Sequence, residues 1–319
     1  EDLTIEVETD NNDVGITYVV EAVQTAAGTP SISSALSAFG NTWHTLVINT
    51  YGTNTTVMDS LESTNGIPDP SIPTGRYSGT QFKPFIALTG STADDPSDIT
   101  DARLADVTVA ICPAPASKGL PLEAAANMCV LFARNSQDNP HLDIYGSTYA
   151  DMPVPTDLDI GSMATYSNRD AFVKKGCSTV DINVNKYRVI DFVTTYHPVG
   201  ENPPQYRYCR NLMLDWNVYY TYFLLEQTYL VGATIAANDD TVSASGVIKP
   251  KIWKGIVDQM ADDLSSRALI AEASFTQDSL TVDISGTNPD RLETFFRYKR
   301  TGVARISSTT AEAGFNFGG

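Results

Sequence analysis

Side chains that commonly carry out catalysis are few in this sequence. Three histidines, His44, His141 and His197, stand far apart, and none has the HExxH spacing of a zinc-protease helix. His44 falls within the apolar run WHTLVINTY and is interpreted as a core residue. The GxSxG, GxGxxG and GxxxxGK[ST] motifs are also missing. The sequence therefore predicts no catalytic residue, no metal site and no cofactor.

The thiols and the acidic runs give equally weak signals for chemistry. Four cysteines, Cys112, Cys129, Cys177 and Cys209, form no CxxC motif and are interpreted as free thiols, with two disulfides as the alternative. The runs DDPSD (94–98) and DLDIG (157–161) offer oxygen ligands but lack the spacing of an EF-hand loop. Helix caps and turns explain these acids better than a calcium site does.

Distant carboxylates leave one enzymatic alternative open. Glycosidase-type acids need not be close in the chain, so their pairing cannot be read from spacing. An α/β hydrolase-like enzyme with dispersed catalytic carboxylates is therefore the alternative function of a different class.

Charge is the strongest compositional feature. The net charge of −17 argues against direct nucleic-acid binding, and no apolar run reaches the length of a membrane-spanning helix, so no membrane insertion is predicted. Residues 1–110 hold 15 acids and three bases, whereas residues 291–305 hold five bases and one acid. This asymmetry indicates either stacking of copies or ordinary scatter of surface charge. The start, EDLTIEVETD, is interpreted as part of a longer or trimmed protein.

Apolar strands alternate with helices in the first half. Residues 31–155 predict an α/β layer structure whose sheet is covered on both faces, with some mixed strand pairing. Its clearest helix is PLEAAANMCVLFARNSQDN (121–139), and HLDIYG (141–146) is expected to be its last strand. The Pro-rich stretch ADMPVPTDLDIGS marks a boundary near residues 150–160.

The second half reads as α+β. Two strands (178–185 and 186–196) precede a long aromatic helix over 203–231, which is expected to pack on strand 187–196. An amphipathic helix follows over 249–268, with Ile252, Ile256, Met260 and Leu264 predicted on its buried face. A strand is expected at 278–286, and FFRYKR (295–300) is interpreted as an edge strand made soluble by its bases.

Three stretches in matching order carry a family resemblance. They are GTPSISSALSAFGNTWHTLVINTYGTNTTVMDSL (28–61), NRDAFVKKGCSTVDINVNKYRVIDFVTTY (168–196), and VIKPKIWKGIVDQMADDL (247–264) followed by NPDRLETFF (288–296). Together they resemble the contractile tail sheath proteins of myophages, most closely the Mu-like branch, with relatives in R-type bacteriocins and contractile injection systems. The chain departs from that pattern in a longer C-terminal strand and in residues 66–90.

The resemblance implies a fold and a domain plan. It implies mixed β-sheets flanked by helices, α/β in the middle and α+β in the C-terminal part, with an extended C-terminal β arm. The implied domains are a β-rich N-terminal remnant (1–30), an α/β middle domain (31–155), an inner tube-facing domain (156–300) and the arm (301–319).

The resemblance also implies a structural role and its contact sites. Sheath subunits form helical tubes, built from hexameric rings, around a tail tube, and arms from each subunit add strands to neighbouring sheets. Expected arm contacts are Arg297, Lys299, Val303, Ala304, Arg305, Ile306, Phe315 and Phe317. Tube-facing candidates are Lys249, Lys251 and Lys254, with ordinary solvated lysines as the alternative.

Partners and location follow from the same resemblance. The expected partners are other copies of the chain, the tail tube protein, and the baseplate and tail terminator proteins. The expected location is the phage tail of a virion assembled in the host cytoplasm. The sheath of a phage-derived bacteriocin or injection system is a second alternative.

Overall fold

The computed structural model describes residues 30–69, 71–78 and 82–305, and the expected β-rich N-terminal remnant, apart from residue 30, lies outside these ranges. The α-helices are α1 (Ser33–Ser37), α2 (Thr55–Asn65), α3 (Ser97–Thr100), α4 (Pro121–Asp138), α5 (Tyr166–Lys174), α6 (Cys209–Leu225), α7 (Pro250–Ser266) and α8 (Ala273–Ser279). The strands are β1 (Leu46–Asn49), β2 (Ile86–Ser91), β3 (Val109–Pro113), β4 (Thr179–Asn183), β5 (Lys186–Asp191), β6 (Thr234–Ile235), β7 (Val247–Ile248), β8 (Ile270–Ala271), β9 (Thr281–Ile284), β10 (Leu292–Phe295) and β11 (Lys299–Arg300).

A three-stranded parallel sheet, in the order β1-β2-β3, forms the centre of the first half. Leu46 lies opposite Ile86, and Ala87 lies opposite Val109. The expectation of mixed pairing in this sheet is wrong. Each connection passes through a helix, α2 and then α3, and so returns the chain to start the next strand in the same direction.

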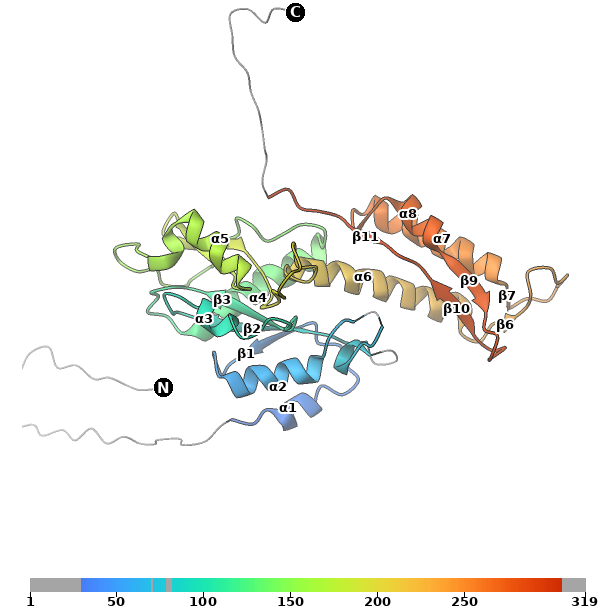
Figure 1. Cartoon of the computed structure of the whole chain (residues 1–319), viewed down its shortest axis with the longest axis horizontal. Helices are drawn as coiled ribbons and strands as arrows, with labels where there is room; N and C mark the ends of the chain where they lie inside the picture. The colour runs from blue at the N-terminus through green and yellow to red at the C-terminus, as the bar shows by residue number, and fades with distance from the viewer. Residues whose placement is uncertain (1–29, 70, 79–81, 306–319) are drawn as a thin grey trace, which may run out of the picture.

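Helices cover both faces of this sheet, as expected. Ile86 and Leu88 of β2 share a buried cluster with residues of α4, whereas Ala87, between them, lies in another cluster with Val57 and Leu61 of α2. Alternate residues of a strand point to opposite faces, so α4 and α2 lie on opposite sides of the sheet (Figure 1).

The packing of α4 on the sheet requires one glycine. A Cβ on Gly90 of β2 would lie 1.6 Å from the carbonyl oxygen of Pro121, the first residue of α4. The main chains of strand and helix therefore touch at this point, and no larger residue fits.

An antiparallel hairpin of β4 and β5 follows, as the sequence predicts. Val184 and Asn185 both have positive φ at its turn, which matches the twist of a tight hairpin. The strand expected at 141–146 is absent and gives way to turns. Only Ile144 of that run is buried, while Leu142 and Tyr145 are exposed, so the run has too few apolar contacts to hold a strand.

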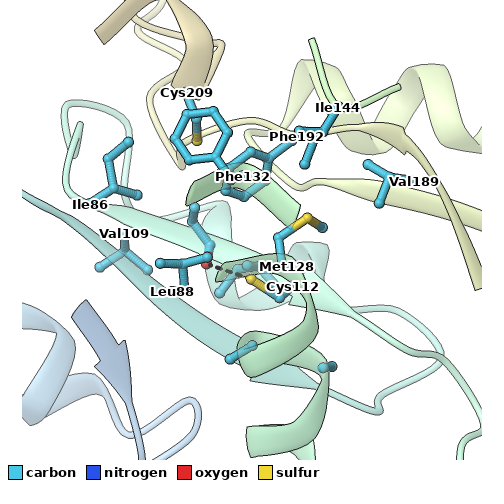
Figure 2. Close-up of a cluster of buried hydrophobic side chains, with 14 of the residues drawn as sticks. Ile86, Leu88, Val109, Cys112, Met128, Phe132, Ile144, Val189, Phe192 and Cys209 are labelled. Atoms are coloured by element: carbon cyan, nitrogen blue, oxygen red, sulfur yellow. Dashed lines mark hydrogen bonds between the residues drawn. The ribbon is translucent and has the colours of Figure 1, made fainter. Parts of the chain in front are cut away.

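Two hydrophobic clusters share α6. The larger one joins the sheet, α4 and the β4–β5 hairpin with Cys209, Leu212 and Trp216 of α6, and Figure 2 shows Phe132 facing Phe192 within it. The smaller one starts with Leu214 and Val218 of α6. The two clusters meet within α6. The domain boundary expected from the sequence lies elsewhere, between residues 155 and 156, and remains a prediction.

The second cluster is built around α7. Its buried stripe is Trp253, Val257, Met260, Ala261 and Leu264. Met260 and Leu264 are buried, as predicted, but Ile256 is half-buried and Ile252 is 46% exposed, so the buried face is centred on Trp253 and Val257. Trp253 takes the central position because its ring contacts Tyr222 and its indole N–H donates to Thr294.

Candidate assembly interface

Residues 297–305, the described part of the expected arm contacts, run along the same chain. Arg297 is exposed, with its guanidinium 5.5 Å from the centre of the Phe295 ring, and Lys299 forms an ion pair with Glu272 at 2.5 Å. Val303 is half-buried and Ala304 exposed, and neither lies in a strand. Ile306, Phe315 and Phe317 lie outside the described residues.

Asp215 on α6 gives this segment its first firm contact. Arg300 donates to both carboxylate oxygens of Asp215, at 2.7 and 2.5 Å, and the Tyr298 hydroxyl donates to the same group at 2.8 Å. Burial works against the charged guanidinium, but the paired Asp215 outweighs it and raises the pKa of Arg300. Two parallel hydrogen bonds between a guanidinium and a carboxylate fix the orientation of both side chains and also strengthen the ion pair.

Arg210, one turn earlier on α6, makes the second contact. Its guanidinium donates to the carbonyl and hydroxyl oxygens of Thr301, both at 2.7 Å, and to the carbonyl of His141. The Thr301 hydroxyl in turn donates to the carbonyl of Ala268, which follows α7. Through the buried Arg210, Thr301 thus connects the larger hydrophobic cluster, around the β1–β3 sheet, with the smaller one, around α7. The parts of the chain built on these clusters are here called the first and the second body.

Arg305 makes the third contact. It forms ion pairs with Asp143 and, at 2.6 Å, with Asp191, and its guanidinium lies 3.9 Å from the centre of the Tyr208 ring. Burial lowers the pKa of Arg305 to about 10 and raises the pKa of Asp191. Burying any of these charges without a partner would be costly, so removing Arg305, Asp143 or Asp191 should destabilise the groups that remain.

These three contacts border a cleft of about 630 Å³ between residues 203–211, which include the start of α6, and the C-terminal segment. Its charged lining residues are Arg210, Arg300 and Arg305, and no carboxylate of the described part of the chain lines it. Each of the three guanidinium groups binds groups of the same chain, so these contacts hold the segment in place.

The paired bases also bear on the charge asymmetry of the sequence. Arg291, Lys299, Arg300 and Arg305 each form an ion pair within the chain. The described residues therefore give no support to stacking of the basic stretch 291–305 of one copy on the acidic stretch 1–110 of another.

The lysines expected to face a tube lie at the start of α7. The Lys249 ammonium donates to the carbonyl of Asp240, and Lys254 donates to the carbonyl of Leu280 at 2.9 Å. Lys251 is exposed, and its side chain makes no hydrogen bond or ion pair with the described residues. Of the three, Lys251 is best placed to meet another molecule.

The aromatic helix α6 places its tyrosines on different faces. Tyr219 stacks on Phe82 with ring centres 3.6 Å apart, and Tyr222 packs against Trp253 in the second cluster. Tyr220 contacts Trp43 and is 48% exposed. The helix starts at Cys209, later than predicted, and ends in a π-helical turn, Glu226–Leu230.

A shallow apolar groove lies between α6 and α7. It has a volume of about 450 Å³ and is lined by Leu225, Tyr229, Ile252 and Ile256, among others. Exposed apolar grooves of this kind often bind protein.

The residues considered for chemistry are placed as follows. All four cysteines are free, and Cys112, Cys177 and Cys209 are buried, as Figure 2 shows for Cys112 and Cys209. His44 is exposed and precedes β1, so its assignment to the core is wrong; its ring lies against Phe39, 5.1 Å between centres.

The acidic runs serve as turn and cap residues, as interpreted. Asp95 accepts from the Ser97 backbone, and Asp159 accepts from the Gly161 backbone. Within residues 30–69, 71–78 and 82–305, no group of three His, Cys, Asp or Glu side chains could hold a metal. No helix in these ranges is long and apolar enough to cross a membrane.

Sequence reasoning missed the residues that hold the segment: Arg210, Asp215, Asp143 and Asp191. One signal was available. Arg210 and Asp215 are the charged residues of CRNLMLDWNVYYTYFLL, a stretch that is otherwise mostly apolar and aromatic, and charges in such a helix usually have partners. Asp143, in the turns after α4, and Asp191, at the end of β5, are distant in the chain from the segment and carry no local signal.

Comparisons with known proteins bear on the fold. No protein-family model and no curated protein sequence matches the chain. The structure is similar to the crystal structure of a sheath tail protein from Desulfitobacterium hafniense, with a TM-score of 0.52 and 10% sequence identity. The match covers 84% of this chain and 59% of that chain, so this chain spans less than two thirds of that protein's length.

A second similarity is weaker. It is to the cryo-EM structure of the anti-feeding prophage baseplate, with a TM-score of 0.47 and 12% identity, over 74% of this chain and 62% of that chain, and is too distant to support an inference. The chain thus has a fold similar to that of a tail sheath protein, as its sequence stretches indicated. Its place in the Mu-like branch stays a prediction.

Proposed function

We propose that this chain is a structural subunit of a contractile phage tail sheath, which polymerises helically around the tail tube and contracts to drive the tube through the host envelope. The observation that carries the proposal is the fold shared with a sheath tail protein over 84% of this chain. Fold alone does not fix function, so the remaining support must come from surfaces suited to assembly.

Open strand edges provide such surfaces. Among the described strands, β10 pairs only with β9, and β11 pairs only with β8. An unpaired edge can take a strand from another chain through main-chain hydrogen bonds, with little demand on side chains. A linkage of this type can be kept while subunits move as rigid bodies.

The proposed partners are further copies of the chain in hexameric rings, the tail tube, and the baseplate and terminator proteins. Lys251 is the preferred tube-facing residue, because Lys249 and Lys254 bind carbonyls of their own chain. The proposed location is the virion tail, after assembly in the host cytoplasm.

The hydrolase alternative gains no support from the carboxyls with raised pKa. Burial raises the pKa of Glu62, Asp191, Glu226 and Asp258. A two-carboxylate hydrolase needs such groups together in one cleft. None of the four lines the cleft at residues 203–211 or the groove between α6 and α7.

Electron microscopy tests the proposal. The purified chain should form long tubular polymers in negative stain, and a chain lacking residues 301–319 should sediment as a monomer. A full-length chain that stays monomeric even in the presence of its tail tube protein would refute a sheath role. Hydrolysis of model glycosides or esters, abolished by changing two carboxylates of one cleft, would favour the enzyme.

A further inference from the structure

Residues 298–305, here called the strap, cross from the second hydrophobic body to the first. Tyr298, at the start of the strap, packs with Phe296 in the second cluster, and β11 pairs with β8, so the strap leaves the second body after Arg300. It then passes α6, where Asp215 and Arg210 hold Arg300 and Thr301.

The strap ends at the first body. Asp191 is the last residue of β5, and Asp143 lies in the turns after α4, so Arg305 joins the strap to two separate parts of that body. The side chain of Asp143 is 6% exposed, and the guanidinium of Arg305 also lies over the Tyr208 ring. Breaking this contact should cost more free energy than breaking a surface ion pair, because losing one partner leaves a buried charge unpaired.

The neighbouring base Arg297 shows the contrast. Its side chain is exposed, stacks on Phe295, and forms no ion pair with the described residues. The firm attachment therefore belongs to the strap, and Arg305 makes it at the far end.

We propose that Arg305 is the positioning residue that fixes where the C-terminal segment leaves its own subunit. This inference rests on the proposed sheath function. It moves the start of the exchanged arm from residue 301 to residue 306, because Thr301 and Arg305, at the two ends of residues 301–305, already bind groups of their own chain. Only residues 306–319 are then available to pair with a neighbouring copy.

A distance measurement tests the anchor in the full chain. Nitroxide labels are placed on cysteines introduced at Ala304 and Lys186, both exposed, after Cys129 is replaced by Ser. The parent and the control Arg297→Met should give one narrow distance distribution by double electron–electron resonance. Arg305→Met should lose that narrow distribution while its near-ultraviolet circular dichroism stays unchanged.

A milder variant covers the case in which Arg305→Met fails to fold. Asp191→Asn keeps the shape of the carboxylate and removes its charge, so it should broaden the same distribution. If the distribution stays narrow in this variant and in a folded Arg305→Met protein, Arg305 does not position the segment and the proposal is overturned.

Two truncations separate this proposal from the sheath function itself. A chain ending at Arg305 should fail to assemble, as should one ending at Arg300. If the chain ending at Arg305 assembles and the chain ending at Arg300 does not, residues 301–305 are the exchanged part and the proposal is wrong. If both assemble as the parent does, the arm is not needed, and that part of the proposed function fails whatever the distance measurement shows.

Discussion

Replacing Asn65 by Ala should destabilise the fold strongly, although the residue is a single polar side chain at the end of a short helix. Asn65 is fully buried. Its amide nitrogen donates to the Phe85 carbonyl and to the Thr108 hydroxyl, both at 2.9 Å, and its oxygen accepts from the Phe85 backbone N–H at 2.8 Å. One side chain therefore ties α2 to the start of β2 and to the residue before β3.

The magnitude follows from the groups left behind. Asn65→Ala removes the side-chain partner of two main-chain groups of Phe85, and each buried group left unpaired costs ~1–3 kcal/mol. With the bond to Thr108 worth ~1 kcal/mol, the expected loss in free energy of unfolding is about 4 kcal/mol. Equilibrium urea unfolding, followed by tryptophan fluorescence, measures this loss.

The matched control lies at the other end of the same helix. Asn54 caps α2 by accepting from the Val57 backbone N–H at 3.2 Å. Asn54→Ala should cost only ~1 kcal/mol, as exposed caps usually do. If Asn65→Ala costs no more than Asn54→Ala, the three buried bonds are not what holds α2 to the sheet, and the reasoning is refuted.

Two further predictions concern the sheet and the hairpin. Gly90→Ala should lower the free energy of unfolding in urea by ~3 kcal/mol or more, because its Cβ would lie 1.6 Å from the Pro121 oxygen. The control is Gly255→Ala in α7, where an added Cβ would meet no neighbouring group within 4 Å, and this change should be neutral or stabilising. Equal effects of the two changes on the free energy of unfolding would contradict the close contact at Gly90. Burial raises the pKa of Tyr187 to about 12, above its unfolded value near 10, so its contribution to stability is complete below pH ~10 and is lost as the pH rises toward 12. Urea unfolding of Tyr187→Phe between pH ~9 and ~11 should show a shallower loss of stability than the parent, and an identical slope would count against this assignment.

Local signals predicted the elements whose ends are set by nearby residues. The helix α4 begins at Pro121, where the expected helix 121–139 starts. The strands β2 and β3 are apolar and fully buried, as expected for a sheet covered on both faces. Caps and apolar runs depend on few distant contacts, and so they can be read from sequence.

Features that depend on distant contacts were not predictable in the same way. The buried face of α7 turned toward Trp253 because Tyr222 and Thr294, from other elements, surround that ring. The candidate interface shows the same limit. Arg305 was named from the sequence, but it binds carboxylates in the turns after α4 and at the end of β5, and no local pattern indicates that pairing.

The sharing of α6 between the two clusters has a mechanical consequence. The helix has 17 residues, a rod of about 25 Å at 1.5 Å per residue, and each end is embedded in a different apolar body. A load on either body is transmitted along unbroken main-chain hydrogen bonds, with the strap as a parallel tether. The molecule should therefore tilt as one stiff lever under force, and bending would require breaking the helix itself.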